Sequence, residues 1–161
     1  MENEQLHEFK KILIPLDGSK LSENALRYGV SLADKYNAEI ILVSVFSLKD
    51  HDNLFKKRIE EMNPQLSEDV KNVPLMYLME NYHGILKSAV DRQEINVKSV
   101  LREGNISSDS VFNILIDVVE KEKIDLIVIS SHGKSGFKKL KLGSVTDKLI
   151  TSLSIPVLCV R

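Results

Sequence analysis

The residues whose types and spacing could do chemistry are concentrated in residues 124–145, I-D-L-I-V-I-S-S-H-G-K-S-G-F-K-K-L-K-L-G-S-V. The apolar run at residues 126–129 has the length and β-branched content of a buried strand. Small and basic residues follow, and after Gly143 and Ser144 apolar residues recur at helical spacing. A strand, a small-residue loop and a helix in this order present backbone N–H groups and a helix N-terminus to an anion. The stretch therefore predicts a phosphate-binding loop.

A second polar cluster is the Asp-Gly-Ser turn at residues 17–19, which directly follows the apolar run K-I-L-I-P-L. Pro15 lacks the N–H donor of a sheet ladder, so it is expected at the end of that strand. Either Ser19 or Ser22 could cap the helix that follows. Asp17 has two interpretations, a side chain that closes an Asx-turn or caps the helix, and a ligand-binding carboxylate.

Several residues of the glycine-rich stretch also have purely structural interpretations. Ser144 followed by Asp147 matches a capping box at a helix start. The lysines at positions 134, 138, 139 and 141 could screen a phosphate or form a solvated basic loop. His132 could touch a phosphate or transfer a proton, but a loop histidine without a catalytic role is the simpler interpretation. Cys159, the single cysteine, is expected to be a packing residue.

The elements that must position these residues alternate along the chain. Nearly continuous apolar runs are typical of a parallel sheet covered on both faces, and the β-α alternation predicts right-handed crossovers. We expect residues 47–73 to form either a flexible excursion or a lid, and the sequence does not distinguish between the two. We expect the third strand at an edge of the sheet. Strands are expected at residues 11–16, 38–46, 96–101, 126–129 and 155–160, and helices at residues 19–36, 74–94, 111–119 and 145–153.

In such sheets ligands bind beyond the carboxyl ends of the strands, where the strand order reverses. If the first and fourth strands are neighbours there, the turn at Asp17 and the loop at Gly133 face one crevice. Two clusters that are far apart in the sequence would then form one site.

Length and composition limit the class of protein. The chain has 161 residues, enough for one domain, which we expect to span residues 1–161 with a leader at residues 1–9. Its net charge is −1 (22 basic minus 23 acidic residues), which gives no charge argument for nucleic acid or a membrane surface. No apolar run approaches the ~20 residues of a membrane span, and the N-terminus is polar and acidic. These features predict a cytoplasmic protein.

Other phosphate-binding and catalytic motifs do not fit the sequence. A P-loop that ends at Lys134 would need a glycine where Val128 stands, and no G-x-G-x-x-G pattern is present. The hydrolase elbow G-x-S-x-G, the zinc motif H-E-x-x-H and the redox motif C-x-x-C are also absent.

From K-I-L-I-P-L-D-G-S to I-P-V-L-C-V-R the chain closely resembles the universal stress protein family. The family motif Gly-x2-Gly-x9-Gly-(Ser/Thr) falls on Ser130, Gly133, Gly143 and Ser144, with serine in place of the first glycine. The resemblance implies a doubly wound, Rossmann-like α/β fold with a five-stranded parallel sheet in the order 3-2-1-4-5 and helices on both faces.

The resemblance also implies a nucleotide site. In the ATP-binding branch of the family the motif residues hold the phosphates, and the residue at Asp17 contacts the ribose. The strand positions at Val43 and Ile129 contribute to the adenine pocket. Two further positions, Pro15 and Val145, match residues around the nucleotide. ATP, with or without Mg²⁺, is the implied ligand, and we predict no metal site of the protein's own.

The predicted function is that of an ATP-binding regulatory protein of the stress response, without an enzymatic role. Because some family members bind no nucleotide and Ser130 departs from the motif, a nucleotide-free dimeric adaptor is the alternative. A slow ATPase is a weaker one, since no general base or carboxylate pair for magnesium accompanies the loop. The resemblance implies a homodimer formed through the last strand, from Pro156 to Val160. We also expect a protein partner of unknown identity, and neither nucleic acid nor membrane as a partner.

Overall fold

A computed structural model describes residues 8–46, 95–104, 107–132 and 142–161. The predicted excursion at residues 47–73, the predicted helix at residues 74–94 and most of the predicted leader lie outside these ranges. The described elements are β1 (Lys11–Pro15), α1 (Lys20–Tyr36), β2 (Glu39–Phe46), β3 (Val97–Glu103), α4 (Ser108–Glu122), β4 (Leu126–Ser130), α5 (Ser144–Ser152) and β5 (Val157–Val160).

The strands form one parallel sheet in the order β3-β2-β1-β4-β5, which confirms the predicted fold and strand order. β3 lies at one edge, as its partial alternation of apolar and polar residues predicts, and β5 lies at the other. The chain adds β2 on one side of β1 and β4 on the opposite side, so the strand order reverses between β1 and β4. This is the place where doubly wound sheets bind ligands.

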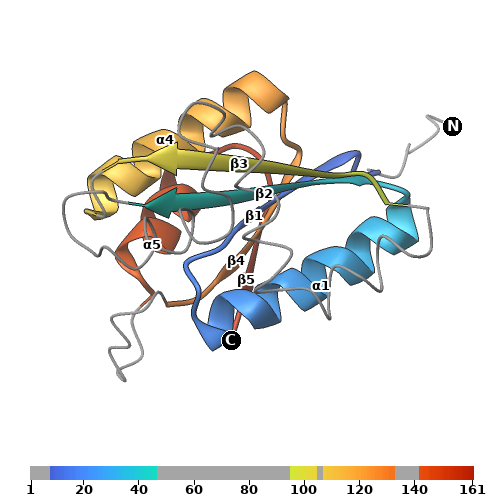
Figure 1. The fold of residues 1–161 in the computed structure, drawn as a ribbon, viewed down its shortest axis with the longest axis horizontal. Helices are drawn as coiled ribbons and strands as arrows, with labels where there is room; N and C mark the ends of the chain where they lie inside the picture. Colours follow the sequence, from blue (N-terminus) through green and yellow to red (C-terminus); the bar gives the residue numbers. More distant parts are fainter. Residues whose placement is uncertain (1–7, 47–94, 105–106, 133–141) are drawn as a thin grey trace, which may run out of the picture.

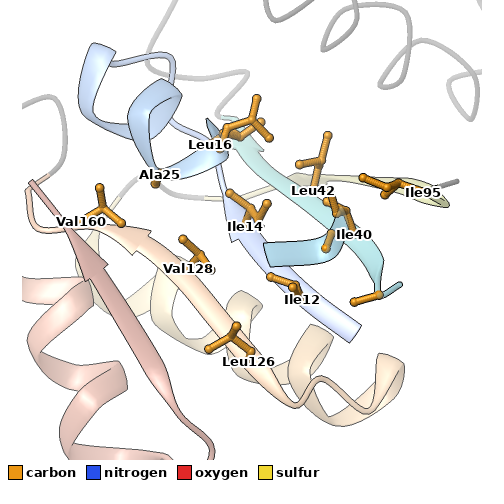
Figure 2. Close-up of a cluster of buried hydrophobic side chains, with 13 residues drawn as sticks. Ile12, Ile14, Leu16, Ala25, Ile40, Leu42, Ile95, Leu126, Val128 and Val160 are labelled. Atoms are coloured by element: carbon orange, nitrogen blue, oxygen red, sulfur yellow. The ribbon is translucent and has the colours of Figure 1, made fainter. Parts of the chain in front are cut away.

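Helix α1 covers one face of the sheet, and α4 and α5 cover the other (Figure 1). On the α1 face, alternate strand residues such as Ile12, Ile14 and Val128 are fully buried against Ala25 and its neighbours (Figure 2). Because successive strand residues point to opposite faces, the residues between them, such as Leu13 and Ile127, face α4 and α5. The two covered faces explain why these strands are almost entirely apolar.

Local side chains set the ends of the helices. The Ser19 hydroxyl accepts a hydrogen bond from the Ser22 N–H at 3.1 Å, so Ser19 is the cap of α1 and Ser22 lies in its first turn. Asn37 ends the helix in the left-handed conformation that asparagine tolerates. Ser107 caps α4 in the same way as Ser19 caps α1, accepting from the Ser110 N–H.

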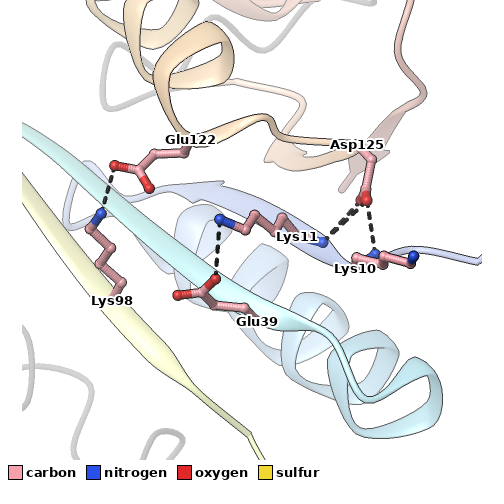
Figure 3. Close-up of polar contacts among 6 residues, drawn as sticks. All are labelled: Lys10, Lys11, Glu39, Lys98, Glu122 and Asp125. Atoms are coloured by element: carbon pink, nitrogen blue, oxygen red, sulfur yellow. Dashed lines mark hydrogen bonds and ion pairs between the residues drawn. The ribbon is translucent and has the colours of Figure 1, made fainter.

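A carboxylate joins β1 to β4 at the amino-terminal edge of the sheet. Asp125 accepts hydrogen bonds from the backbone N–H groups of Lys10 and Lys11, at 2.9 and 3.1 Å (Figure 3). Its own N–H donates to the Lys11 carbonyl. Charge-assisted bonds to backbone N–H groups are stronger than exposed ion pairs. Asp125 therefore fixes the start of β4 beside the start of β1. Figure 3 also shows two ion pairs, Lys11–Glu39 and Lys98–Glu122.

Helix α1 approaches the sheet closely at Gly29. A Cβ atom there would clash with Cδ1 of the buried Ile14. We predict that Gly29→Ala lowers the free energy of unfolding by about 1–2 kcal/mol, because overpacking outweighs the better helix propensity of alanine. The matched control is Ser31→Ala on the exposed side of the same helix, which should be neutral or slightly stabilising. Urea unfolding of the three proteins measures both effects, and equal stability of Gly29→Ala and wild type would contradict the close packing.

Candidate functional site

Strands β1 and β4 are paired only near their amino ends. Their ladder consists of Ile12 opposite Leu126 and Leu13 opposite Ile127. In contrast, β1 pairs with β2 over its whole length, and β4 stays paired with β5 up to its last residue. β1 therefore stays paired with β2, and β4 with β5, up to their carboxyl ends. β1 and β4 move apart from each other after their first two paired residues. This separation lies at the reversal of strand order and forms the candidate site.

The end of β1 is fastened to β2. Pro15 lies opposite Val43 in the ladder, and the Leu16 N–H donates to the Val43 carbonyl at 2.8 Å. The buried Ser44 hydroxyl donates to the Leu16 carbonyl at 3.1 Å. These bonds place β1 and the turn behind it on the β2 side of the separation. The structure thus confirms Pro15 as a strand end.

The turn after β1 is built around Asp17. Its carboxylate accepts a hydrogen bond from the Ser19 N–H at 2.9 Å, which is the predicted Asx-turn. Gly18 has φ of 80°, a left-handed conformation that suits glycine. Asp17 is half-buried in this turn, beside the end of β1. The turn residue that the sequence singled out therefore lies at the carboxyl edge of the sheet, next to the separation.

The opposite wall of the separation consists of the end of β4 and the start of α5. The buried Thr146 hydroxyl donates to the Ser130 carbonyl at 2.9 Å. The Ser131 N–H donates to the Val160 carbonyl, and the Ser131 carbonyl accepts from the Gly143 N–H, each at 2.7 Å. These bonds hold the N-terminus of α5 against the end of β4. They bring Ser130, which ends β4, together with Gly143 and with Ser144 and Val145 in the first turn of α5.

The predicted capping box of α5 is wrong. The N-cap is Gly143, not Ser144, and this residue has no side chain that could cap the helix. Ser144 is the first helical residue and is exposed, and the first backbone bond of the helix runs from the Asp147 N–H to the Gly143 carbonyl. The sequence pattern failed because the Ser131–Gly143 bond fixes the helix start one residue earlier. Gly143 has φ of −61° and ψ of 147°, which any residue can adopt, so its backbone conformation does not require glycine.

Ser130 occupies its position without backbone strain. It is the last residue of β4, directly after Ile129, and its φ is not positive, so the dihedral freedom of glycine is not needed there. Strand alternation places its side chain on the α1 face, opposite to that of Ile129. The serine in place of the first motif glycine is therefore compatible with the fold.

The side chains of two predicted adenine-pocket residues belong to the core. Val43 is 1% exposed and Ile129 is 6% exposed, and both pack under α4 and α5. Val145 packs against the same cluster and is partly buried. Pro15 lies on this face as well, because it alternates with Leu13 through Ile14. Four predicted site residues thus share one face of the sheet beside the separation.

The remaining predictions have different outcomes. Gly133 and the four loop lysines lie outside the described residues. Burial raises the pKa of the Cys159 thiol, while the Arg161 guanidinium acts in the opposite direction, so the thiol is protonated near neutral pH and fits the predicted packing role.

Among the described residues, no group of three or more His, Cys, Asp and Glu side chains could hold a metal ion. None of the helices in the described ranges has the length and apolar character that a bilayer span requires.

Comparison with known proteins matches this geometry to a family. The sequence profile of the universal stress protein family matches residues 8–161, almost the whole chain. The chain belongs to the universal stress protein family. The predicted membership is thereby confirmed, and the glycine-rich stretch and the turn at Asp17 both lie within the matched region.

Relatives of this universal stress protein match nearly the whole of this chain. Universal stress protein MJ0577 of Methanocaldococcus jannaschii is 29% identical over 168 residues, covering 95% of both chains, and its structure has a TM-score of 0.66 with 96% of both chains covered. Universal stress protein MJ0531 of the same organism is 26% identical over 153 residues, which is 95% of this chain and 82% of the relative. The Archaeoglobus fulgidus universal stress protein, solved in complex with dAMP, shares the fold at 16% identity, with a TM-score of 0.55 and coverage of 96% and 100%.

Sequence reasoning missed two residues that build the site, Ser131 and Thr146. Their partners, Gly143 and Ser130, are 12 and 16 residues away in the sequence, so no local pattern reveals the bonds. The one available signal was a threonine in the first turn of an amphipathic helix, where the core-facing position is usually apolar.

We predict that Thr146→Val lowers the free energy of unfolding by about 1–3 kcal/mol, because the buried Ser130 carbonyl loses its hydroxyl donor. Thr151→Val is the matched control, because its hydroxyl donates to the Asp147 carbonyl on the exposed side of the same helix. That variant should stay within about 0.5 kcal/mol of wild type. Urea unfolding compares the two, and equal effects would show that the Thr146 bond does not anchor α5.

Proposed function

We propose that this universal stress protein binds ATP in the separation between β1 and β4, as a regulatory ligand of the stress response. The observation that carries the proposal is the uncapped N-terminus of α5, which is bonded to the end of β4 at the reversal of strand order. Nucleotides bind at this place in doubly wound sheets, with their phosphates at a helix N-terminus.

The phosphates would lie against the first turn of α5. Helices α1 and α4 satisfy a first-turn N–H with a serine side chain, whereas α5 begins with a glycine and has no such bond. An anion can take the place of the missing cap and gains from the helix dipole. In this proposal Gly143, Ser144 and Val145 contact the phosphates, together with Gly133 and Ser130 of the glycine motif. Mg²⁺ would enter with the ATP phosphates.

The ribose and adenine would lie toward β1. In this proposal the Asp17 carboxylate, which is half-buried beside the end of β1, would accept hydrogen bonds from ribose hydroxyls. Pro15, Val43 and Ile129 would surround the base. Because the Val43 and Ile129 side chains are almost fully buried, the proposal assigns base recognition at these two positions mainly to their backbone groups.

The relatives agree with an adenine nucleotide as the ligand class. The Archaeoglobus fulgidus universal stress protein was solved with dAMP, and a second universal stress protein of this fold was solved with cAMP. The nucleotide is proposed as a ligand that changes conformation or partner choice. A cytoplasmic location and a protein partner stay predictions.

We also propose that two copies pair through β5. This strand forms one edge of the sheet, where N–H and C=O groups are available to another chain. Leu158 on this strand is 37% exposed, and Ile150 on α5, the helix that precedes the strand, is 42% exposed. Pairing of two copies would cover both the strand edge and these side chains, in agreement with the predicted interface from Pro156 to Val160.

We predict that Gly143→Asp raises the free energy of unfolding by a few tenths of a kcal/mol, because aspartate is a better N-cap than glycine. The same substitution should weaken ATP binding at least tenfold, because the carboxylate occupies the N–H groups and repels the phosphates. Gly143→Asn is the matched control, since it supplies a cap without the charge and should weaken ATP binding less. Calorimetric titration of ATP with Mg²⁺ measures the affinities, and thermal unfolding measures the stabilities.

Wild type is expected to bind ATP in the micromolar range, which corresponds to roughly 8 kcal/mol. Absence of binding at millimolar ATP would contradict the proposal and favour the nucleotide-free adaptor. Binding that is equally strong in wild type and Gly143→Asp would place the nucleotide away from α5.

The proposed pairing predicts that Leu158→Lys converts a dimer into a monomer at micromolar concentration, because a charge would be buried in the interface. Asn96→Lys is the control, an exposed position next to the opposite edge strand, and it should leave the dimer intact. Sedimentation velocity distinguishes the two states. A monomeric wild type would contradict pairing through β5.

A further inference from the structure

The carboxyl end of β5 is hydrogen-bonded to both walls of the separation between β1 and β4. The Ser131 N–H, on the wall formed by the end of β4 and the start of α5, donates to the Val160 carbonyl at 2.7 Å. The Asn24 side-chain amide, on the helix that begins directly after the Asp17 turn, donates to the Arg161 carbonyl at 2.8 Å. Two consecutive carbonyls at the end of an edge strand therefore join the two walls.

This bridge lies at the edge of the sheet where strand pairing does not join the walls. β1 and β4 are paired only at their amino ends, so their ladder does not fix the width of the separation at the carboxyl edge. Apolar packing brings β5 to α1, since Val160 and Ala25 belong to one core cluster (Figure 2). The end of the chain lies beside the first turns of α1 (Figure 1). The two directional bonds add a defined position for each wall relative to β5.

The two bonds of the bridge differ in their exposure to water. Ser131 is 1% exposed and Val160 is 6% exposed, so water does not compete for the bond between their backbone groups. The bond from Asn24 to the Arg161 carbonyl is exposed and competes with water, which makes it the weaker of the two. The end of β5 is therefore held firmly to the β4 wall and weakly to the α1 wall.

We propose that pairing of a second copy along β5 and ATP binding in the separation favour each other, with the end of β5 as the link and Asn24 as its positioning residue. The inference rests on the proposed function, including the pairing through β5, and adds a dependence of each on the other. A second chain bonded along β5 reduces the freedom of its last residues, so the Asn24 bond forms at a smaller entropic cost. The walls then already have the spacing that ATP, which contacts both, requires.

The test measures this coupling in both directions with ATP and Mg²⁺. Calorimetry compares the ATP affinity of wild type, at concentrations where it is dimeric, with that of the monomeric variant Leu158→Lys. We expect the dimer to bind ATP about threefold more tightly. Because a dimer has two ATP sites, reciprocity then requires saturating ATP to lower the dimer dissociation constant about ninefold, which sedimentation measures.

Asn24→Ala tests whether the coupling passes through the end of β5. It removes the amide donor and should bring both ratios close to one, while ATP still binds and two copies still pair. Leu158→Lys in the Asn24→Ala background supplies the monomeric reference. Ser31→Ala, on the exposed side of the same helix, is the matched control and should keep both ratios. A merely structural role of Asn24 would change stability or affinity without changing the ratios.

The outcomes separate this inference from the proposed function. Absence of ATP binding, or a monomeric wild type, would overturn the proposed site or the proposed pairing, and the inference with it. If wild type binds ATP and forms dimers, but ATP leaves the dimer dissociation constant unchanged, the inference alone is overturned. Ratios in Asn24→Ala equal to those of wild type would also overturn it, because the coupling would then not pass through the end of β5.

Discussion

The structure depends on how far the two central strands, β1 and β4, are paired with each other and with their outer neighbours. Each pairs with its outer neighbour to its carboxyl end, but the two pair with each other only at Ile12–Leu126 and Leu13–Ile127. Asp125 holds them together at the amino edge by accepting from the backbone of Lys10 and Lys11. The sheet is therefore closed at one edge and open at the other. The right-handed twist of parallel strands makes such an opening natural where the strand order reverses.

A few short polar contacts keep both walls of this opening in place. Ser44 fastens the chain after β1 to β2, and Thr146 fastens α5 to the end of β4. In both cases a buried hydroxyl donates to a backbone carbonyl at the end of a central strand. Hydrogen bonds of this kind contribute about 1 kcal/mol each to stability, but their directionality fixes position better than apolar packing does. The apolar faces supply the stability of the domain, and these hydroxyls supply the geometry of its edge.

The helix caps indicate the position at which the domain is less stable than it could be and at which we propose that a ligand binds. Serine caps α1 and α4, whereas Gly143 leaves α5 without a side-chain cap, although its dihedral angles would permit serine or aspartate. The domain forgoes a few tenths of a kcal/mol of stability at that position. The buried Nε2 of His132, which has no hydrogen-bond partner among the described residues, is a second local cost beside the same helix. Unsatisfied polar groups at a ligand site are expected in the free protein, because the ligand satisfies them.

The sequence by itself determined the elements and their class, because apolar runs and helical spacing are local patterns. It also indicated the end of β1 at Pro15, the turn at Asp17 and, through the family resemblance, the strand order. It could not determine the start of α5. The capping-box pattern at Ser144 is local, but the Ser131–Gly143 bond that overrides it joins residues distant in sequence. Only the tertiary structure decided that Thr146 anchors the helix and that the Val43 side chain is buried, because both depend on which segments pack together.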